Sequence, residues 1–239
     1  MSLQYSQIIS QIEKECGFEK GAIQNNATRL ADFTEDINLA DSDGYAIAIG
    51  ACATWQVDDS SHTDYDIIST DLVSGQRDYT WTTDGSGNLI LDVYKVMIKT
   101  PDGTLVDITP VDRNIASPNV TSFETSATGT PTQYDKLGNG IFLDVIPNYS
   151  IDDGLQLFVN RESVPFTVSD TTKKSGLDGR CHEYLVLKPA YKYARSHSLN
   201  NVARLENDVM KMEEKIRQTY ASRERDVMKK MIPAYQNNR

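Results

Sequence analysis

Helical periodicity at both ends of the chain, with short β-like runs between them, constrains the fold more than any other feature. Residues 3–15 place Ile8, Ile9 and Ile12 among polar side chains, which predicts a short amphipathic helix that Gly17 ends. A second helix follows, with Asn25 or Asn26 as its cap. Its apolar positions, at steps of three, four or eight, are Leu30, Phe33, Ile37, Ala40, Ala48, Cys52 and Trp55. Residues 41–44 favour a helix only weakly, so the second helix is expected to break or bend there.

The C-terminal third returns to a helical pattern. Residues 182–196 predict a helix that Pro189 kinks or divides into two pieces. The last helix carries a nearly a/d apolar stripe that needs a partner helix. Its members are Val202, Leu205, Val209, Met212, Ile216 and Tyr220, and Pro233 ends the pattern.

The middle of the chain predicts a small antiparallel sandwich or barrel of short strands. Asp102-Gly103 and Asn139-Gly140 are the strongest hairpin signals. Residues 113–131, rich in Ser, Thr, Pro and Asn, predict a long exposed loop. The expected strands are 67–70, 77–82, 89–99, 105–108, 132–135, 141–145, 155–160 and 166–168, and turns are expected at 74–75, 84–87, 101–103, 138–140 and 152–154.

These patterns together predict an α+β fold. Residues 1–65 and 173–232 form a helical bundle, residues 66–172 form an inserted β module, and residues 233–239 form a C-terminal tail. The charge distribution fits this pairing of the two ends. Residues 1–65 carry three basic and eleven acidic side chains, whereas residues 173–239 carry fifteen basic and eight acidic ones. The basic third is therefore expected to meet an acidic surface, either its own N-terminal third, a neighbouring subunit or nucleic acid.

The sequence offers no convincing catalytic, metal or cofactor site, so a non-enzymatic protein without cofactors is expected. His62 lies among Asp58, Asp59, Asp64 and Asp66, but the spacing does not match an EF-hand loop. Cys181 and His182 are neighbours in a helical stretch and point about 100° apart, which does not make a nucleophile–base pair.

The cellular setting is predicted from what the sequence lacks. The three cysteines, Cys16, Cys52 and Cys181, have long spacings and are expected to be reduced thiols. No stretch reaches the roughly 18 apolar residues needed to span a bilayer, and the start of the chain does not read as a secretory signal. A protein folded in a cytoplasm, without a membrane partner, is the expectation.

Several stretches resemble the head-to-tail adaptor (connector, or head-completion) proteins of tailed bacteriophages. The resemblance covers most of residues 1–195 and rests on the order and spacing of structural motifs. The matching stretches are 5–12 (YSQIISQI), 55–59 (WQVDD), 70–79 (TDLVSGQRDY), 131–143 (PTQYDKLGNGIFL) and 182–185 (HEYL). One departure is that the turn after the fourth stretch has the single proline Pro147 where the family pattern has two.

The resemblance implies a structural subunit of the virion neck, assembled in the host cytoplasm, in which a helical bundle carries an inserted β module. Such subunits form a homo-oligomeric ring, commonly of twelve, beneath the portal protein and offer a platform to tail or nozzle proteins. Genome DNA passes through the channel without sequence-specific binding, and an acidic subunit would keep it mobile by repulsion. The C-terminal segment reaches the portal in this family. The corresponding candidate portal or ring contacts are Lys229, Lys230, Met231, Pro233, Tyr235 and Arg239.

Other functions remain as alternatives. Another ring-forming virion component, such as a tail terminator or tail hub, would share the ring but not the paired terminal helices. A DNA-binding protein would use the basic C-terminal helix, although its cations alternate with Glu213, Glu214, Glu224 and Asp226. A carbohydrate-active enzyme would need paired carboxylates, for which Asp58/Asp59 and Asp152/Asp153 are the candidates.

Overall fold

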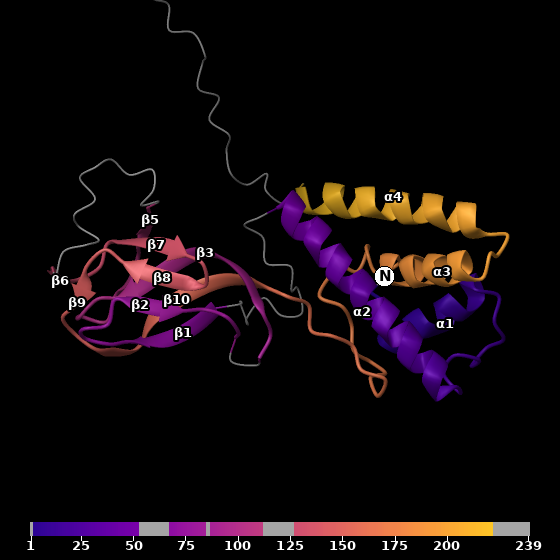
Figure 1. Ribbon diagram of the computed structural model, residues 1–239, viewed down its shortest axis with the longest axis horizontal. Coiled ribbons are helices and arrows are strands. Elements are labelled where there is room, and N and C mark those ends of the chain that lie inside the picture. The colour runs from indigo at the N-terminus through magenta and orange to yellow at the C-terminus, as the bar shows by residue number, and fades with distance from the viewer. Residues whose placement is uncertain (1, 53–66, 85–86, 112–126, 222–239) are drawn as a thin grey trace, which may run out of the picture. The chain divides into compact units, whose positions relative to one another are not determined.

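The computed structural model describes residues 2–52, 67–84, 87–111 and 127–221. These residues have an α+β fold, as predicted, and separate into two compact units (Figure 1). We call the described residues up to Cys52 and from Phe166 onward the helical unit, and those from Ile67 to Pro165 the β unit.

The helical unit brings the two ends of the chain together, which confirms the predicted bundle. Helix α1 packs against α3, and α2, α3 and α4 pack against one another. Segments from opposite ends of the sequence therefore share one hydrophobic core. The four helices among the described residues are α1 (Tyr5–Glu15), α2 (Ala27–Ala51), α3 (Tyr184–Ser196) and α4 (Val202–Ala221).

Local signals set the ends of the first two helices. Gly17 adopts a φ of 73° and donates its N–H to the Lys14 carbonyl, while the Phe18 N–H bonds the Glu13 carbonyl. This pair of bonds is the Schellman motif that ends a helix at glycine. Asn26 is the N-cap of α2, since its side chain accepts the Arg29 N–H at 3.0 Å.

The apolar stripe of α4 faces the bundle, as its spacing predicted. Leu205, Val209, Met212, Ile216 and Tyr220 are all buried in the core of the helical unit. Burying such side chains stabilises the fold by roughly 1.5–3 kcal/mol each. The core of this unit is therefore built from both the first and the last helix of the described chain.

Neither of the two predicted breaks in the helices is present, while the alternative predictions of a bend at residues 41–44 and a kink at Pro189 stay predictions. Helix α2 continues through residues 41–44, where a Cβ on Gly44 would lie 2.7 Å from Leu177 Cδ1. The glycine thus permits close packing against a neighbouring segment and does not break the helix. Pro189 does not divide its helix, because α3 runs unbroken from Tyr184 to Ser196 and buries the proline ring.

The β unit is a sandwich of two main sheets that share one core. One sheet has the order β1-β10-β3-β4 and is antiparallel throughout, and the other has the order β2-β8-β7-β5. The β5–β7 pair and the small β6–β9 sheet are parallel. The strands are β1 (Ile67–Leu72), β2 (Asp78–Thr80), β3 (Ile90–Lys99), β4 (Leu105–Asp107), β5 (Thr109–Pro110), β6 (Thr128–Gly129), β7 (Gln133–Leu137), β8 (Gly140–Leu143), β9 (Ile146–Pro147) and β10 (Ile151–Arg161).

Both predicted hairpins are present. Strands β3 and β4 are joined at Asp102-Gly103, where Gly103 has a φ of 84°. Strands β7 and β8 are joined by a two-residue turn, in which Gly138 takes the positive φ of 57° and Gly140 already pairs with Leu137. The Asn139-Gly140 signal therefore predicted this hairpin correctly, but the two turn residues are Gly138 and Asn139, one position earlier.

The predicted turn at residues 152–154 is wrong, because these residues lie inside β10. The register between β1 and β10 shifts between Thr70 and Leu72, which makes this a β-bulge. Asp153 has a φ of 52°, and its N–H bonds the Asp71 carboxylate at 2.9 Å. A Cβ on Gly154 would lie 2.6 Å from Leu72 Cβ, so only glycine fits beside β1 here.

The predicted strand at residues 166–168 is also wrong, because this segment is irregular. Asn38 of α2 accepts the Phe166 N–H at 2.7 Å and donates to its carbonyl at 2.9 Å. A side-chain amide thus replaces the ladder partners of a strand, and the Phe166 ring stacks on Tyr5. Most of the predicted loop at residues 113–131 lies outside the described residues, and its last part contains β6.

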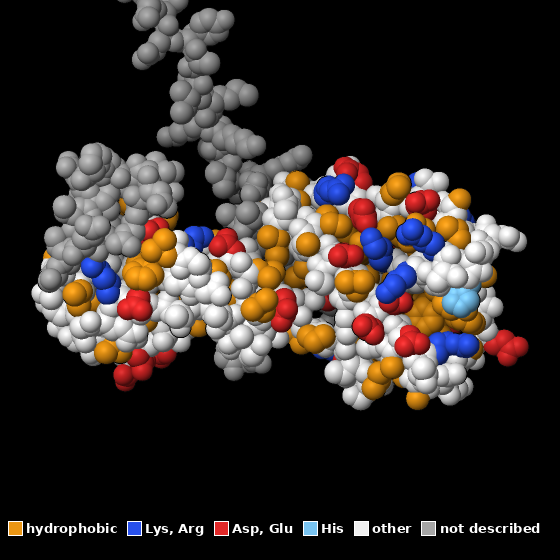
Figure 2. All heavy atoms as spheres, in the orientation of Figure 1, with side chains coloured by type: hydrophobic (Ala, Val, Ile, Leu, Met, Phe, Trp, Pro, Cys, Tyr) orange, Lys and Arg blue, Asp and Glu red, His pale blue; other side chains and the backbone are white. Residues whose placement is uncertain are grey.

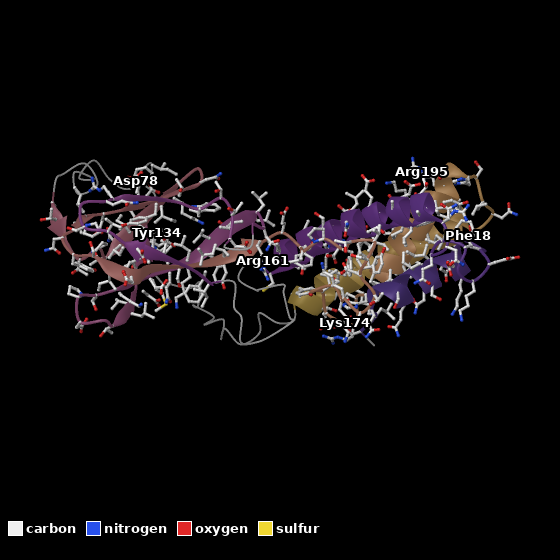
Figure 3. The ribbon with its side chains drawn as sticks, turned by 90° about the horizontal axis from the view of Figure 1, so that it is seen from below. Phe18, Asp78, Tyr134, Arg161, Lys174 and Arg195 are labelled. Atoms are coloured by element: carbon white, nitrogen blue, oxygen red, sulfur yellow. The ribbon has the colours of Figure 1, made fainter. Side chains whose placement is uncertain are left out.

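The core of the β unit comes from alternate residues of its longest strands. Val96 and Ile98 of β3 and Leu155 and Leu157 of β10 are fully buried and face the second sheet. Tyr134 of β7 lies inside this unit (Figure 3). These buried positions alternate along each strand, as they do where one face of a sheet lies in the core.

Candidate functional site

The predicted portal or ring contacts lie outside the described residues. They are Lys229, Lys230, Met231, Pro233, Tyr235 and Arg239. The carboxylate-rich stretch with His62, Asp58, Asp59, Asp64 and Asp66 also lies outside them. These positions stay predictions.

Cys181 and His182 do not form a catalytic pair, and both are buried in the helical unit. The Leu3 N–H donates to His182 Nδ1 at 3.0 Å, and Nε2 donates to the Leu177 carbonyl at 2.8 Å. Both ring nitrogens are therefore committed to backbone groups. Burial raises the pKa of the Cys181 thiol, which keeps it protonated and unreactive.

The candidate carboxylate pair Asp152/Asp153 is part of the β-bulge. Both side chains are exposed on the β unit, and the Lys99 ammonium donates to the Asp152 carbonyl at 3.1 Å. The presence of these two residues is therefore explained by the β-bulge, in which Asp153 has a left-handed backbone conformation. Across the described part of the chain, no group of three or more His, Cys, Asp or Glu side chains is arranged to hold a metal ion.

Ion pairs join the acidic N-terminal helices to the basic C-terminal helices. Lys192 of α3 pairs with Asp36 of α2, and Arg204 of α4 pairs with Glu15 of α1. The hydrogen bond to Asp36 raises the pKa of the Lys192 ammonium. Each such exposed pair stabilises the fold by only about 0–1 kcal/mol. Acidic and basic side chains are interleaved over this unit (Figure 2), so part of the charge asymmetry is neutralised within the chain.

An aromatic cluster lies at one end of the helical unit. Tyr193 packs against Phe18 and Phe33 and stacks on His197, with ring centroids 4.0 Å apart for the last pair. The Arg29 guanidinium lies over the Phe18 ring at 4.7 Å. Figure 3 shows Phe18 at the same end of this unit as Arg195. The cluster fastens the segment after α1 to α2 and α3.

Grooves are present on the described part of the helical unit. One, of about 260 Å³, lies between α2 and α3, and the Lys192–Asp36 pair belongs to its lining. Another, of about 580 Å³, lies where α2 and α4 end. Its lining includes Ala46, Ile47, Gly50 and Ala51 of α2 and Arg217 and Ala221 of α4. We call this second feature the α2–α4 groove.

Sequence reasoning missed the buried polar groups that fix the helical unit. The Glu13 carboxylate, which is 2% exposed, accepts the Gly21 N–H at 2.8 Å and the Ile23 N–H at 2.9 Å. It satisfies backbone donors in the loop between α1 and α2. A charged residue inside an amphipathic helix is normally read as solvent-exposed, so only the packing identifies this role.

The search for membrane spans gave no candidate among the helices that the structure describes. Comparison with protein-family models gave no match, and comparison with curated proteins gave none either.

Proposed function

We propose that this protein is a structural subunit of the head-to-tail adaptor of a tailed phage. The subunit forms a ring beneath the portal, continues the DNA channel and presents a platform to tail or nozzle proteins. The observation that carries the proposal is that the two chain ends fold into one helical bundle, while the β unit interrupts the sequence between α2 and α3. This order of elements matches what the sequence resemblance implies for such adaptors.

The paired terminal helices favour an adaptor over a tail terminator or tail hub. For those alternatives we expect β structure without helices contributed by both ends of the chain. Here α1 and α2 from the N-terminal side pack against α3 and α4 from the C-terminal side. A ring also requires two different surfaces on each subunit, because neighbours meet head to tail. A helical unit and a separate β unit offer chemically distinct surfaces for this purpose.

Electron microscopy of the full chain, with and without purified portal protein, tests the proposal directly. We expect a ring of this subunit bound to the portal. Replacing Lys229 and Lys230 by Glu should weaken portal binding, whereas replacing the exposed Lys211 and Lys215 of α4 by Glu should leave it nearly unchanged. The opposite ranking would contradict the predicted contact residues.

Salt dependence and particle assembly give independent readouts. If the basic C-terminal segment supplies the contact, ring or portal association weakens as salt rises from about 0.1 to 1 M. Particles made without this subunit should lose their genome and fail to acquire tails. Normal genome retention and tail attachment in such particles would overturn the proposed function.

A further inference from the structure

The α2–α4 groove is an apolar surface that the described chain leaves uncovered. Its lining combines the small or aliphatic side chains of Ala46, Ile47, Ala51 and Ala221 with the polar Glu214, Arg217 and Gln218 of α4. Figure 1 shows the C-terminal ends of these two helices beside one another. Small residues let another backbone or a large side chain approach closely. The groove is thus shaped for an apolar occupant.

Gly50 lines the groove at a point where space is open. A Cβ added at Gly50 would meet no atom within 4 Å, in contrast to Gly44, where it would strike Leu177. A larger side chain at position 50 would therefore extend into the groove without striking the described part of the chain.

The sequence beyond Ala221 has the features of that occupant. Eighteen residues follow, 222–239, and the chain enters them at Ala221, which itself lines the groove. Residues 222–226 are polar and can span up to about 17 Å. After them, two apolar pairs spaced four apart occupy one face of a helical pattern. These are Val227 with Met231 and Met228 with Ile232.

Tethering favours the chain's own segment, because residue 222 follows directly on Ala221 of the groove lining. A short linker gives a tethered segment an effective concentration in the millimolar range. A second copy at micromolar concentration therefore competes poorly for the same groove.

We propose that residues 227–232 dock into the α2–α4 groove of their own chain and cover it in the free subunit. The apolar pairs Val227/Met231 and Met228/Ile232 are the side chains that the groove would take up. This inference concerns the free protein and does not depend on the proposed function.

Limited trypsin digestion of the full-length native chain tests the docking. Cleavage after Lys229 and Lys230, followed by mass spectrometry, should be about 10-fold slower in the wild type than in Gly50→Trp, whose side chain fills the groove. Met231→Asp should accelerate cleavage similarly by removing the apolar contact. Ser42→Trp, at an exposed α2 position outside the groove lining, should cleave at the wild-type rate.

Circular dichroism establishes that each variant is folded before digestion. Equal cleavage rates in the wild type, Gly50→Trp and Met231→Asp would overturn the proposal. Wild-type protection that grows with protein concentration would also overturn it, by assigning the groove to a second copy. Because no portal is present, neither result bears on the adaptor function.

Discussion

His182 and Leu3 are joined by a hydrogen bond although they lie 179 positions apart in the sequence. The Leu3 N–H donates to His182 Nδ1 at 3.0 Å, and the other ring nitrogen donates to the Leu177 carbonyl. The imidazole is 1% exposed, so water cannot replace either bond. A single side chain thus fastens the N-terminal segment to the turn that precedes α3.

His182→Leu should therefore lower the free energy of unfolding by about 1.5–3 kcal/mol, because it leaves the buried Leu177 carbonyl and the partly buried Leu3 N–H without the imidazole. Urea denaturation followed by circular dichroism measures the loss. His197→Leu is the matched control, since this histidine is exposed, stacks on Tyr193 and makes its hydrogen bonds to Ser196 and the Tyr193 carbonyl at the exposed surface. The control should change stability by less than about 1 kcal/mol. Equal losses in the two variants would show that the His182 bonds contribute little.

Glu13→Gln should destabilise the loop between α1 and α2. The carboxylate accepts two backbone N–H groups, and an amide replaces one accepting oxygen by a donor that faces an N–H. The expected loss in the free energy of unfolding is about 1.5–3 kcal/mol. Glu19→Gln, at an exposed position in the same loop, should be nearly neutral. Hydrogen exchange should also become faster at Gly21 and Ile23 in Glu13→Gln, and unchanged exchange there would contradict the anchoring role.

Cys16 should resist alkylation although it is partly exposed. Burial, and secondarily the Glu15 charge, raise the pKa of its thiol to about 12, against about 8.5 in an unfolded chain. At pH 8 the thiolate is therefore scarce in the native state, and labelling by iodoacetamide should be about 10²–10³-fold slower than in urea. Peptide mass spectrometry resolves the labelling of Cys16 from that of Cys52 and Cys181.

The raised pKa of Cys16 also predicts how its labelling rate and its contribution to stability change with pH. The native labelling rate of Cys16 should keep rising between pH 8 and 11, whereas the rate in urea should level off above about pH 9. The same raised pKa means that the unfolded chain loses the thiol proton first. Its contribution to stability is therefore complete below about pH 8.5 and is lost as the pH rises toward 12. A native labelling rate that levels off near pH 9 would contradict the raised pKa.

Asp153→Gly should stabilise the protein. Asp153 has a φ of 52°, a left-handed conformation that costs a non-glycine residue about 1 kcal/mol or more. Glycine removes this strain without changing the N–H that bonds Asp71. The neighbouring Asp152→Gly is the control and should destabilise by about 0.5–1 kcal/mol, since that position has no positive φ. Thermal unfolding of both variants should give shifts in the midpoint of opposite sign.

The sequence by itself determined most of the elements and the buried face of α4. Periodicity identified the stripe of α4 that includes Ile216, Gly17 and Asn26 marked helix ends, and Asp102-Gly103 marked a hairpin, because each signal acts within a few residues. Tertiary structure decided whether a segment with an ambiguous local sequence pattern becomes helix, strand or irregular backbone. Close packing against Leu177 keeps α2 helical at Gly44, pairing with β1 turns residues 152–154 into a bulge, and Asn38 holds Phe166 out of a strand.

The candidate functional residues also divide into those that the sequence predicted and those that only the tertiary structure revealed. The predicted contacts from Lys229 to Arg239 rest on sequence alone, whereas His182, Glu13 and the α2–α4 groove emerge only when distant segments pack together. The physical reason is that burial and hydrogen-bond partners are properties of the assembled chain. A buried carboxylate and a solvent-exposed one look the same in a sequence, and the packing around them makes the difference.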